Sequence, residues 1–229
     1  MTTKERIIEE AFKLFLNHNY EKVSISDLEQ AVGKTRGAIF YFFKNKEELF
    51  NEVIDTYIVK TQKPSEKFNF DANVSLEQFI YLYINGINAT MSKMLSLSVV
   101  NIYKGYFSLY MQASRIYPNF AEIMTQNSVE EINLWEKVIS QAIQSKEIKE
   151  VNTKHYATLF RSCFLGLAFD RCLSYGLNTD ELLVLYQNIC NPIKLKFWCF
   201  HNNVCKNCLI LHTIQYNLLL WKQRFTSLP

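Results

Sequence analysis

The side chains best suited to binding chemistry lie in one basic segment that is rich in aromatic residues. Residues 34–46 read KTRGAIFYFFKNK and include no acid but four cations, Lys34, Arg36, Lys44 and Lys46. An arginine such as Arg36 binds a guanine edge or a phosphate through two parallel hydrogen bonds. Gly37 and Ala38 are small enough to let the backbone approach another surface. The segment is either a nucleic-acid contact or a solvated cationic turn between two helices.

Two helix starts position this segment. Thr35 can cap a helix with its side-chain oxygen, so that Arg36 lies in the first turn. Upstream, Ser24 and Asp27 form the start pattern of a preceding helix, and Gly33 ends it. A helix, a glycine turn and a helix with a basic first turn predict a helix-turn-helix, whose second helix enters the major groove.

A first helix completes a small head. Thr2 and Glu5 can cap it, and its apolar residues recur on one side: Ile7, Ile8, Ala11, Phe12 and Phe15. We therefore predict a three-helix DNA-binding domain over residues 1–48. Residues 46–59 are predicted to continue as one amphipathic helix toward the rest of the chain.

The head carries a family pattern. Its residues are Ala11, Leu14 and Phe15; Ser24-Ile25-Ser26-Asp27-Leu28; Ala31-Val32-Gly33; Thr35-Arg36-Gly37-Ala38-Ile39-Phe40-Tyr41; and Phe43-Lys44-Asn45-Lys46-Glu47-Glu48-Leu49. In this order and density they resemble the DNA-binding domain of the TetR family of bacterial transcriptional repressors. The resemblance implies an all-α fold, with a helix-turn-helix head and a larger helical bundle, and it implies no enzymatic activity.

The resemblance and the residue types together assign the DNA contacts. The candidates are Ser24, Thr35, Arg36, Gly37, Ala38, Phe40, Tyr41 and Lys46. Arg36 is expected to read a base, Gly37 and Ala38 to permit close approach, and the hydroxyls and Lys46 to hold phosphates. One residue departs from the pattern, because the family usually has Tyr where this chain has Phe40. That phosphate contact is then either supplied by Tyr41 or absent.

Charge is a poor guide to DNA binding in this chain. The formal charge is +3, yet residues 1–55 hold eight Lys or Arg and ten Asp or Glu, a local charge of −2. A DNA-binding face must therefore be local and make few phosphate contacts. Tight binding then requires two subunits, which predicts a homodimer on a palindromic operator.

The following residues predict a helical bundle. Helices are expected over residues 75–95, 99–116, 120–148, 153–175 and from 179 to about 189, with a connection at 61–74. Residues 49–190 are assigned to effector binding and dimerisation, and the resemblance implies that the last two helices pair with those of a second copy. Asp170 and Arg171 are either a solvated pair or charges that set the register of that interface.

Aromatic residues concentrate between residues 79 and 135 and have two interpretations. They fill the core, or they line a cavity for a small apolar or aromatic effector. The candidate ligand-binding residues are Tyr83, Tyr103, Phe107, Tyr110 and Trp135.

The tail, residues 191–229, differs from the rest of the chain. It has five Lys or Arg and no acid. Cys205, Cys208, His201 and His212 are weak zinc candidates, because their spacing matches no familiar finger. The main expectation is that no metal is bound and that the tail packs as a helix. A metal-responsive regulator and a shifted reading frame remain as alternatives.

Several functional classes have little support. No nucleophile elbow, glycine-rich phosphate loop or metal-binding helix marks an enzyme, and no cofactor is expected. The six cysteines are too sparse for a disulfide scaffold, and no membrane span or signal peptide is evident. We expect a cytoplasmic, ligand-responsive DNA-binding repressor. The alternative is a helical interaction protein whose helix-turn-helix no longer binds DNA.

Overall fold

The protein is a helical chain in every part that the structure describes. A computed structural model describes residues 1–67, 74–97 and 102–195. These residues belong to one contact unit, Met1–Leu195, and the predicted zinc candidates of the tail lie outside them. The described residues form helices and short helical turns, which are labelled in chain order. Ile148 and Lys194 form one isolated antiparallel β-bridge among them. The all-α prediction is confirmed.

The head begins with three helices whose starts the sequence encodes. They are α1 (Thr3–Asn17), α2 (Ile25–Val32) and α3 (Arg36–Phe40), with a short 3-10 turn η1 (Tyr20–Lys22) between the first two. Thr2 and Ser24 accept hydrogen bonds from the backbone three residues later, as predicted. Gly33 adopts a positive φ of 65° and ends α2, which is the turn that a glycine permits without strain.

The helix that leaves the head changes its winding. Asn45 caps α4 (Lys46–Ile54), which continues through a π-helical turn, η2 (Asp55–Val59), into α5 (Lys60–Gln62). The predicted single α-helix over residues 46–59 therefore has one wide turn within it. The short helix α6 (Pro64–Lys67) lies in the segment predicted as a connection.

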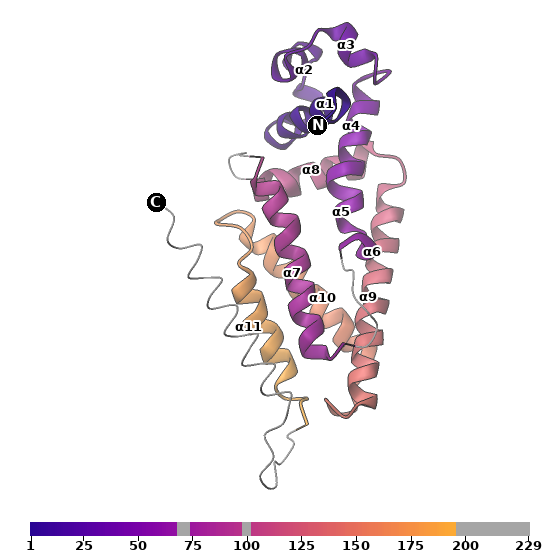
Figure 1. Cartoon of the computed structure of the whole chain (residues 1–229), viewed down its shortest axis with the longest axis vertical. Helices are drawn as coiled ribbons and strands as arrows, with labels where there is room; N and C mark the ends of the chain where they lie inside the picture. Colours follow the sequence, from indigo (N-terminus) through magenta and orange to yellow (C-terminus); the bar gives the residue numbers. More distant parts are fainter. Residues whose placement is uncertain (68–73, 98–101, 196–229) are drawn as a thin grey trace. The chain divides into compact units, whose positions relative to one another are not determined.

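The remaining helices form the bundle shown in Figure 1. Their bounds are α7 (Leu76–Leu95), α8 (Ile102–Ile116), α9 (Phe120–Gln144), α10 (Thr153–Arg171) and α11 (Thr179–Cys190). Two of them end earlier than predicted. Lys146 takes a positive φ of 59° after α9, and Ile148 pairs with Lys194 instead of extending the helix. Gly176, with φ 84°, turns the chain after α10.

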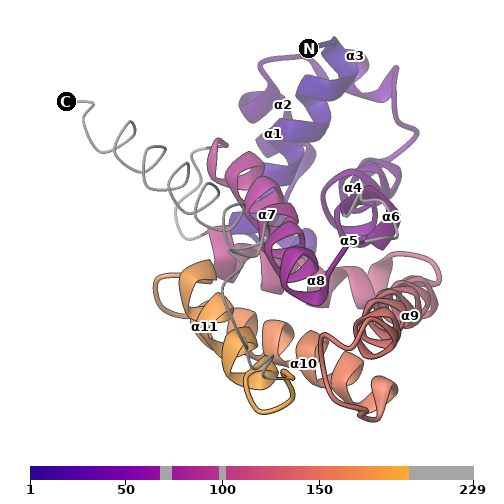
Figure 2. The same cartoon turned by 60° about the horizontal axis from the view of Figure 1, so that its bottom comes forward.

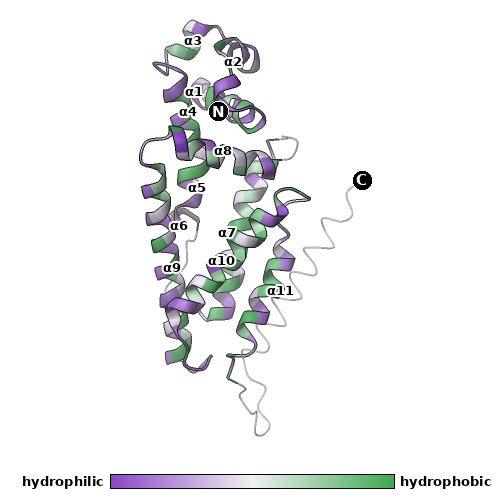
Figure 3. Ribbon diagram, turned by 180° about the vertical axis from the view of Figure 1, so that it is seen from behind, coloured by the Kyte–Doolittle hydropathy of each residue, from purple (hydrophilic) through white to green (hydrophobic). Residues whose placement is uncertain are grey.

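Two apolar clusters hold these helices together. The head core joins α1–α4 with α8 and buries Phe12, Phe15 and Phe50 completely. The bundle core lies among α7, α9, α10 and α11 and is centred on Trp135, which stacks on Phe160 at 4.6 Å between ring centroids. Figure 2 shows α9 beside α10 and α10 beside α11, and Figure 3 shows how apolar and polar residues alternate along α9.

Helix α8 packs with the head, although it follows the head by many residues. A Cβ atom at Gly105 would lie only 2.8 Å from the carbonyl oxygen of Leu16, so the glycine lets α8 touch the end of α1. The backbone N–H of Tyr20 donates to the side chain of Gln112 at 2.7 Å. The head core therefore extends past residue 48, where we predicted the head to end.

Candidate nucleic-acid interface

Helix α3 is presented by a short, tightly held turn. Thr35 caps it through a 3.4 Å contact from the N–H of Ala38, and Ile39 is its buried anchor. Helix α3 has only five residues, and isolated helices of this length are unstable in water. Its orientation therefore depends on packing and on contacts from α2.

The predicted base-reading and close-approach residues lie on the outer side of α3. Arg36 and Gly37 are exposed, Ala38 is half-buried, and no atom lies within 4 Å of a Cβ placed at Gly37. The guanidinium of Arg36 lies 5.6 Å from the ring centre of Phe40, a cation–π distance. Among the described residues, Arg36 forms no side-chain ion pair, so its fork of donors is available to an external acceptor.

The other predicted contacts surround this turn. Thr35 and Tyr41 are exposed, the latter to 82%, and Tyr41 lies edge-on to Phe42. Ser24 is also exposed, but its hydroxyl is engaged by Asp27, whose carboxylate accepts from both the Ser24 side chain and its backbone N–H. The hydrogen bonds from the Ser24 side chain and backbone lower the pKa of Asp27.

Lys46 has an internal partner that its charge alone did not predict. Its ammonium donates to the carbonyl oxygens of Tyr20 and Val23 at 2.9 and 3.0 Å, and it lies 4.2 Å from the ring centre of Tyr20. The side chain therefore fastens η1 to the start of α4. An ammonium has three donors, so one remains for the phosphate contact that stays a prediction.

Arg6 was missed by the sequence reasoning. It is exposed on α1, and its Nη2 atom would lie 3.9 Å from a Cβ atom at Gly33, beside the turn between α2 and α3. None of the ion pairs among the described residues includes Arg6. Only the packing of α1 against α2 places this cation next to the turn, and helical periodicity carries no such signal.

The predicted ligand-binding aromatics are separated by the fold. Tyr83 and Trp135 are fully buried in the bundle core, where their ring centroids lie 4.9 Å apart. Tyr103, Phe107 and Tyr110 are half-buried on α8. Phe107 packs edge-on to Phe169 of α10, while the other two pack against the head core. Their role in effector binding stays a prediction.

A buried carboxylate lies among the bundle helices. Glu131 is 8% exposed, and it accepts a 2.5 Å hydrogen bond from the hydroxyl of Tyr83 and a 3.0 Å bond from Arg161. Burial, followed by the nearby charge of Glu131, raises the pKa of Tyr83 well above its usual value. The phenol stays protonated and acts as a donor, so the buried charge is compensated from two helices.

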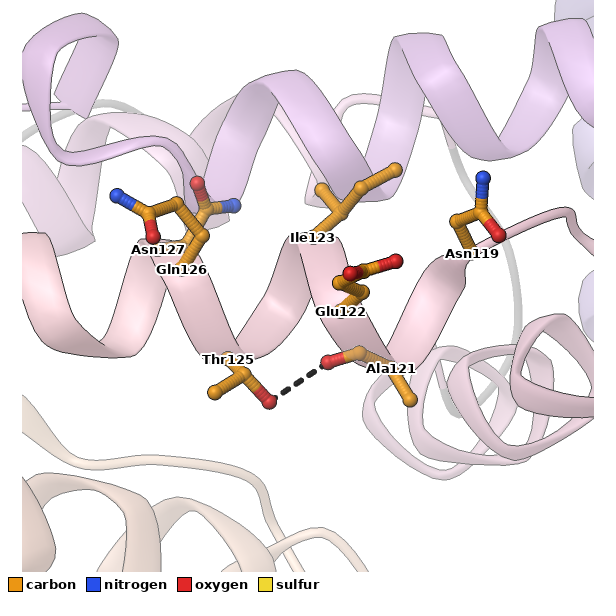
Figure 4. Close-up of a pocket in the computed structure, with 7 residues that line it drawn as sticks. All are labelled: Asn119, Ala121, Glu122, Ile123, Thr125, Gln126 and Asn127. Carbon is orange, nitrogen blue, oxygen red and sulfur yellow. Dashed lines mark hydrogen bonds between the residues drawn. The ribbon is translucent and has the colours of Figure 1, made fainter.

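A cavity of about 730 Å³ opens along the start of α9 (Figure 4). Its lining comprises Asn119, Ala121, Glu122, Ile123, Thr125, Gln126 and Asn127 and exposes more apolar than polar surface. In Figure 4, Ile123 points toward the neighbouring helical segment, whereas Thr125 points away from it and donates to the carbonyl of Ala121 at 2.7 Å. None of the five predicted aromatics is in this lining.

One face of α10 and α11 and the turn between them expose large apolar side chains. The most exposed are Phe169, Leu173 and Tyr175, at 64, 72 and 67%, with Leu159 and Val184 also outside the core. Arg171 contacts Asp170 and also Glu181, at 2.7 Å. These charges therefore connect α10 to α11 within one chain.

Two classes of site find no support in the described residues. No group of His, Cys, Asp or Glu there is arranged to hold a metal ion. Within the same residues, every helix is too short or too polar to cross a bilayer.

Comparisons with known proteins bear on the head. The model of the bacterial regulatory proteins, tetR family, matches residues 7–53. The transcriptional repressor AcnR of Corynebacterium efficiens is 44% identical over 50 residues, 22% of this chain and 27% of AcnR. The transcriptional repressor ComR of Escherichia coli is 33% identical over 84 residues, 37% of this chain and 40% of ComR. The aligned parts therefore span well under half of these relatives.

Solved structures extend the likeness to the whole fold. NalD, the secondary repressor of the MexAB-OprM multidrug efflux pump in Pseudomonas aeruginosa, aligns with a TM-score of 0.60 and 17% identity, covering 85% of this chain and 98% of NalD. PfmR of Thermus thermophilus, a TetR family transcriptional regulator, aligns with a TM-score of 0.58 and 16% identity, covering 81% of this chain and 97% of PfmR. At these identities the likeness concerns the fold alone.

Proposed function

We propose that this chain, whose head matches the model of the tetR family of bacterial regulatory proteins over residues 7–53, is a DNA-binding transcriptional repressor. The observation that carries the proposal is the exposed first turn of α3, where the Arg36 side chain forms no ion pair with any described residue. A helix so presented enters the major groove with its N-terminal residues at the base edges. The repressor names of AcnR and ComR support the same activity, and neither name describes an enzyme.

We assign roles to the head residues as follows. Arg36 reads a base, and Gly37 and Ala38 keep the backbone close to the groove. Thr35 and Tyr41 contact phosphates from exposed positions. The remaining phosphate contacts come from Lys46, through its third donor, and from Ser24, whose hydroxyl has to exchange its hydrogen bond to Asp27 for one to a phosphate.

The repressor acts as a homodimer in this proposal. The apolar face of α10 and α11 exposes Phe169, Leu173 and Tyr175, and large exposed apolar patches mark interaction sites. A second copy offers a self-complementary face, which gives twofold symmetry. Twofold symmetry of two reading heads then requires a palindromic operator.

Response to a small effector is also part of the proposal. Helix α8 touches α1 through Gly105. Tyr106 of α8 accepts a 2.7 Å hydrogen bond from Gln62 of α5, and Tyr117, directly after α8, donates to Asp55 of η2 at 2.5 Å. A ligand that favours one position of α8 therefore favours one position of the head. The open cavity along α9 combines apolar surface with amide groups, and the predicted aromatic residues suit an apolar or aromatic effector.

The test starts with selection of bound duplexes from a random pool by the wild-type protein. Arg36→Ala should bind the selected duplex about 5- to 150-fold more weakly, because a bidentate base contact is worth about 1–3 kcal/mol. Lys137→Ala removes an exposed cation from α9 and serves as the control. Unchanged affinity of Arg36→Ala would refute base reading by this residue. Failure of the wild-type protein to enrich any sequence would refute the proposed activity.

A further inference from the structure

One acidic residue of α2 holds the turn that presents α3. The main-chain carbonyl of Glu29 accepts hydrogen bonds from the N–H groups of both Gly33 and Lys34, at 3.0 and 3.3 Å. Its carboxylate reaches forward and accepts the N–H of Arg36, the first residue of α3, at 2.5 Å. A single half-buried residue therefore connects the last turn of α2, the connecting turn and the first turn of the reading helix.

This bond matters because α3 has few other constraints at its start. The Thr35 cap is long, at 3.4 Å, and the buried anchor Ile39 lies at the far end of the five-residue helix. A side-chain oxygen that accepts a backbone N–H at a helix start satisfies a donor that has no partner within the helix. Arg36 can form two hydrogen bonds to one base only if its own backbone is correctly placed, because this bidentate geometry tolerates little displacement.

We propose that Glu29 is a positioning residue for DNA reading: its carboxylate fixes the first turn of α3, and Arg36 discriminates between bases only while that bond is made. The proposal rests on the proposed function. The length of the Glu29 side chain lets its oxygen accept the Arg36 N–H, and this bond positions α3. The negative charge of Glu29 repels DNA phosphates. Removing the charge while keeping the acceptor should therefore preserve discrimination and strengthen binding to all sequences.

Three substitutions separate reach from charge. Glu29→Gln keeps an oxygen at the same distance without the charge, Glu29→Asp keeps the charge but is too short, and Glu29→Ala loses both. Glu150→Gln is the control for net charge, because Glu150 is exposed beyond α9. The measured quantity is the ratio of affinities for the selected duplex and for an unselected random duplex.

The ratio should fall about 5- to 150-fold in the Asp and Ala variants, as expected for loss of one bidentate base contact. It should stay at the wild-type value in Glu29→Gln and Glu150→Gln. Hydrogen exchange at the Arg36 amide reports the bond without DNA, and it should be slow in the wild type and Glu29→Gln but fast in the Asp and Ala variants. Circular dichroism checks that all variants fold.

Two results would overturn the proposal. One is an unchanged affinity ratio in Glu29→Asp and Glu29→Ala, and the other is an Arg36 amide that exchanges equally fast in the wild type and in Glu29→Ala. Failure of the proposed function has a different signature, since the wild-type protein would then enrich no duplex while the Arg36 amide stayed protected. In that case Glu29 holds the turn but positions no DNA-reading group, and the proposal fails as well.

Discussion

At the residue scale, the cations of the head divide into those with internal partners and those without. Lys4 pairs with Glu52, Lys13 with Glu9 and Glu10, and Lys46 with backbone carbonyls. Arg6, Lys34 and Arg36 form no ion pair among the described residues and flank the same turn. The head therefore presents a local basic surface despite a local charge of −2 over residues 1–55. Several acids of the head lie away from this surface, where Glu9, Glu10 and Glu52 pair with lysines and Asp27 caps α2.

Arg6 gives the first prediction at this scale. Arg6→Gln should weaken binding to selected and random duplexes alike, because a phosphate contact carries no sequence information. The slope of log affinity against log salt concentration should fall by about 1. Titrations at several salt concentrations measure this slope, with Lys137→Gln as a control that removes a cation from the bundle. A slope equal to that of the wild type would show that Arg6 makes no contact with DNA.

At the element scale, α8 is the helix on which head and bundle meet. It contributes Leu109 and Ala113 to the head core, accepts the Tyr20 N–H through Gln112, and contacts α10 through Phe107 and Phe169. Ring packing of this kind adds about 0.5–1.5 kcal/mol beyond the buried area. A displacement of α8 therefore disturbs the head core and the Phe107–Phe169 contact with α10, which makes this helix the expected route between an effector and the head.

Gly105 is the position where this contact can be tested. Gly105→Ala should destabilise the free protein by about 1–3 kcal/mol, because its Cβ would meet the Leu16 carbonyl at 2.8 Å and force α8 away from α1. Gly37→Ala is a matched control, since open space surrounds that position and alanine favours a helix by up to about 1 kcal/mol. Urea unfolding followed by circular dichroism compares the two. A Gly105→Ala protein as stable as the wild type would show that α8 and α1 do not need this close approach.

At the scale of the whole molecule, the apolar face of α10 and α11 controls assembly in our proposal. Phe169→Glu should convert a dimer into a monomer at micromolar concentration, because a charge within an apolar interface costs several kcal/mol when it is buried. Val129→Glu is the control, since Val129 is 45% exposed on α9. Sedimentation velocity distinguishes the two states. A wild-type protein that sediments as a monomer would refute the dimer, and a dimeric Phe169→Glu would place the interface elsewhere.

Local sequence determined the starts and order of the helices in the head. A cap bond links residues three apart, and a glycine turn needs only its own backbone, so Thr2, Ser24, Gly33, Thr35 and Asn45 specify these features without help from the rest of the fold. The family pattern over the same residues is local too. Both were therefore predictable from the chain alone.

Tertiary structure alone decided which side chains remain free for function. The helical pattern of the sequence allows Tyr83 and Trp135 to be either core residues or ligand-binding residues. Packing among α7, α9, α10 and α11 buries both of them fully. Arg6 lies beside the turn and Gly105 beside Leu16 because of how the helices are placed relative to one another, which no periodicity encodes. Helical patterns specify which face is buried, but the partner of that face depends on contacts between residues far apart in the chain.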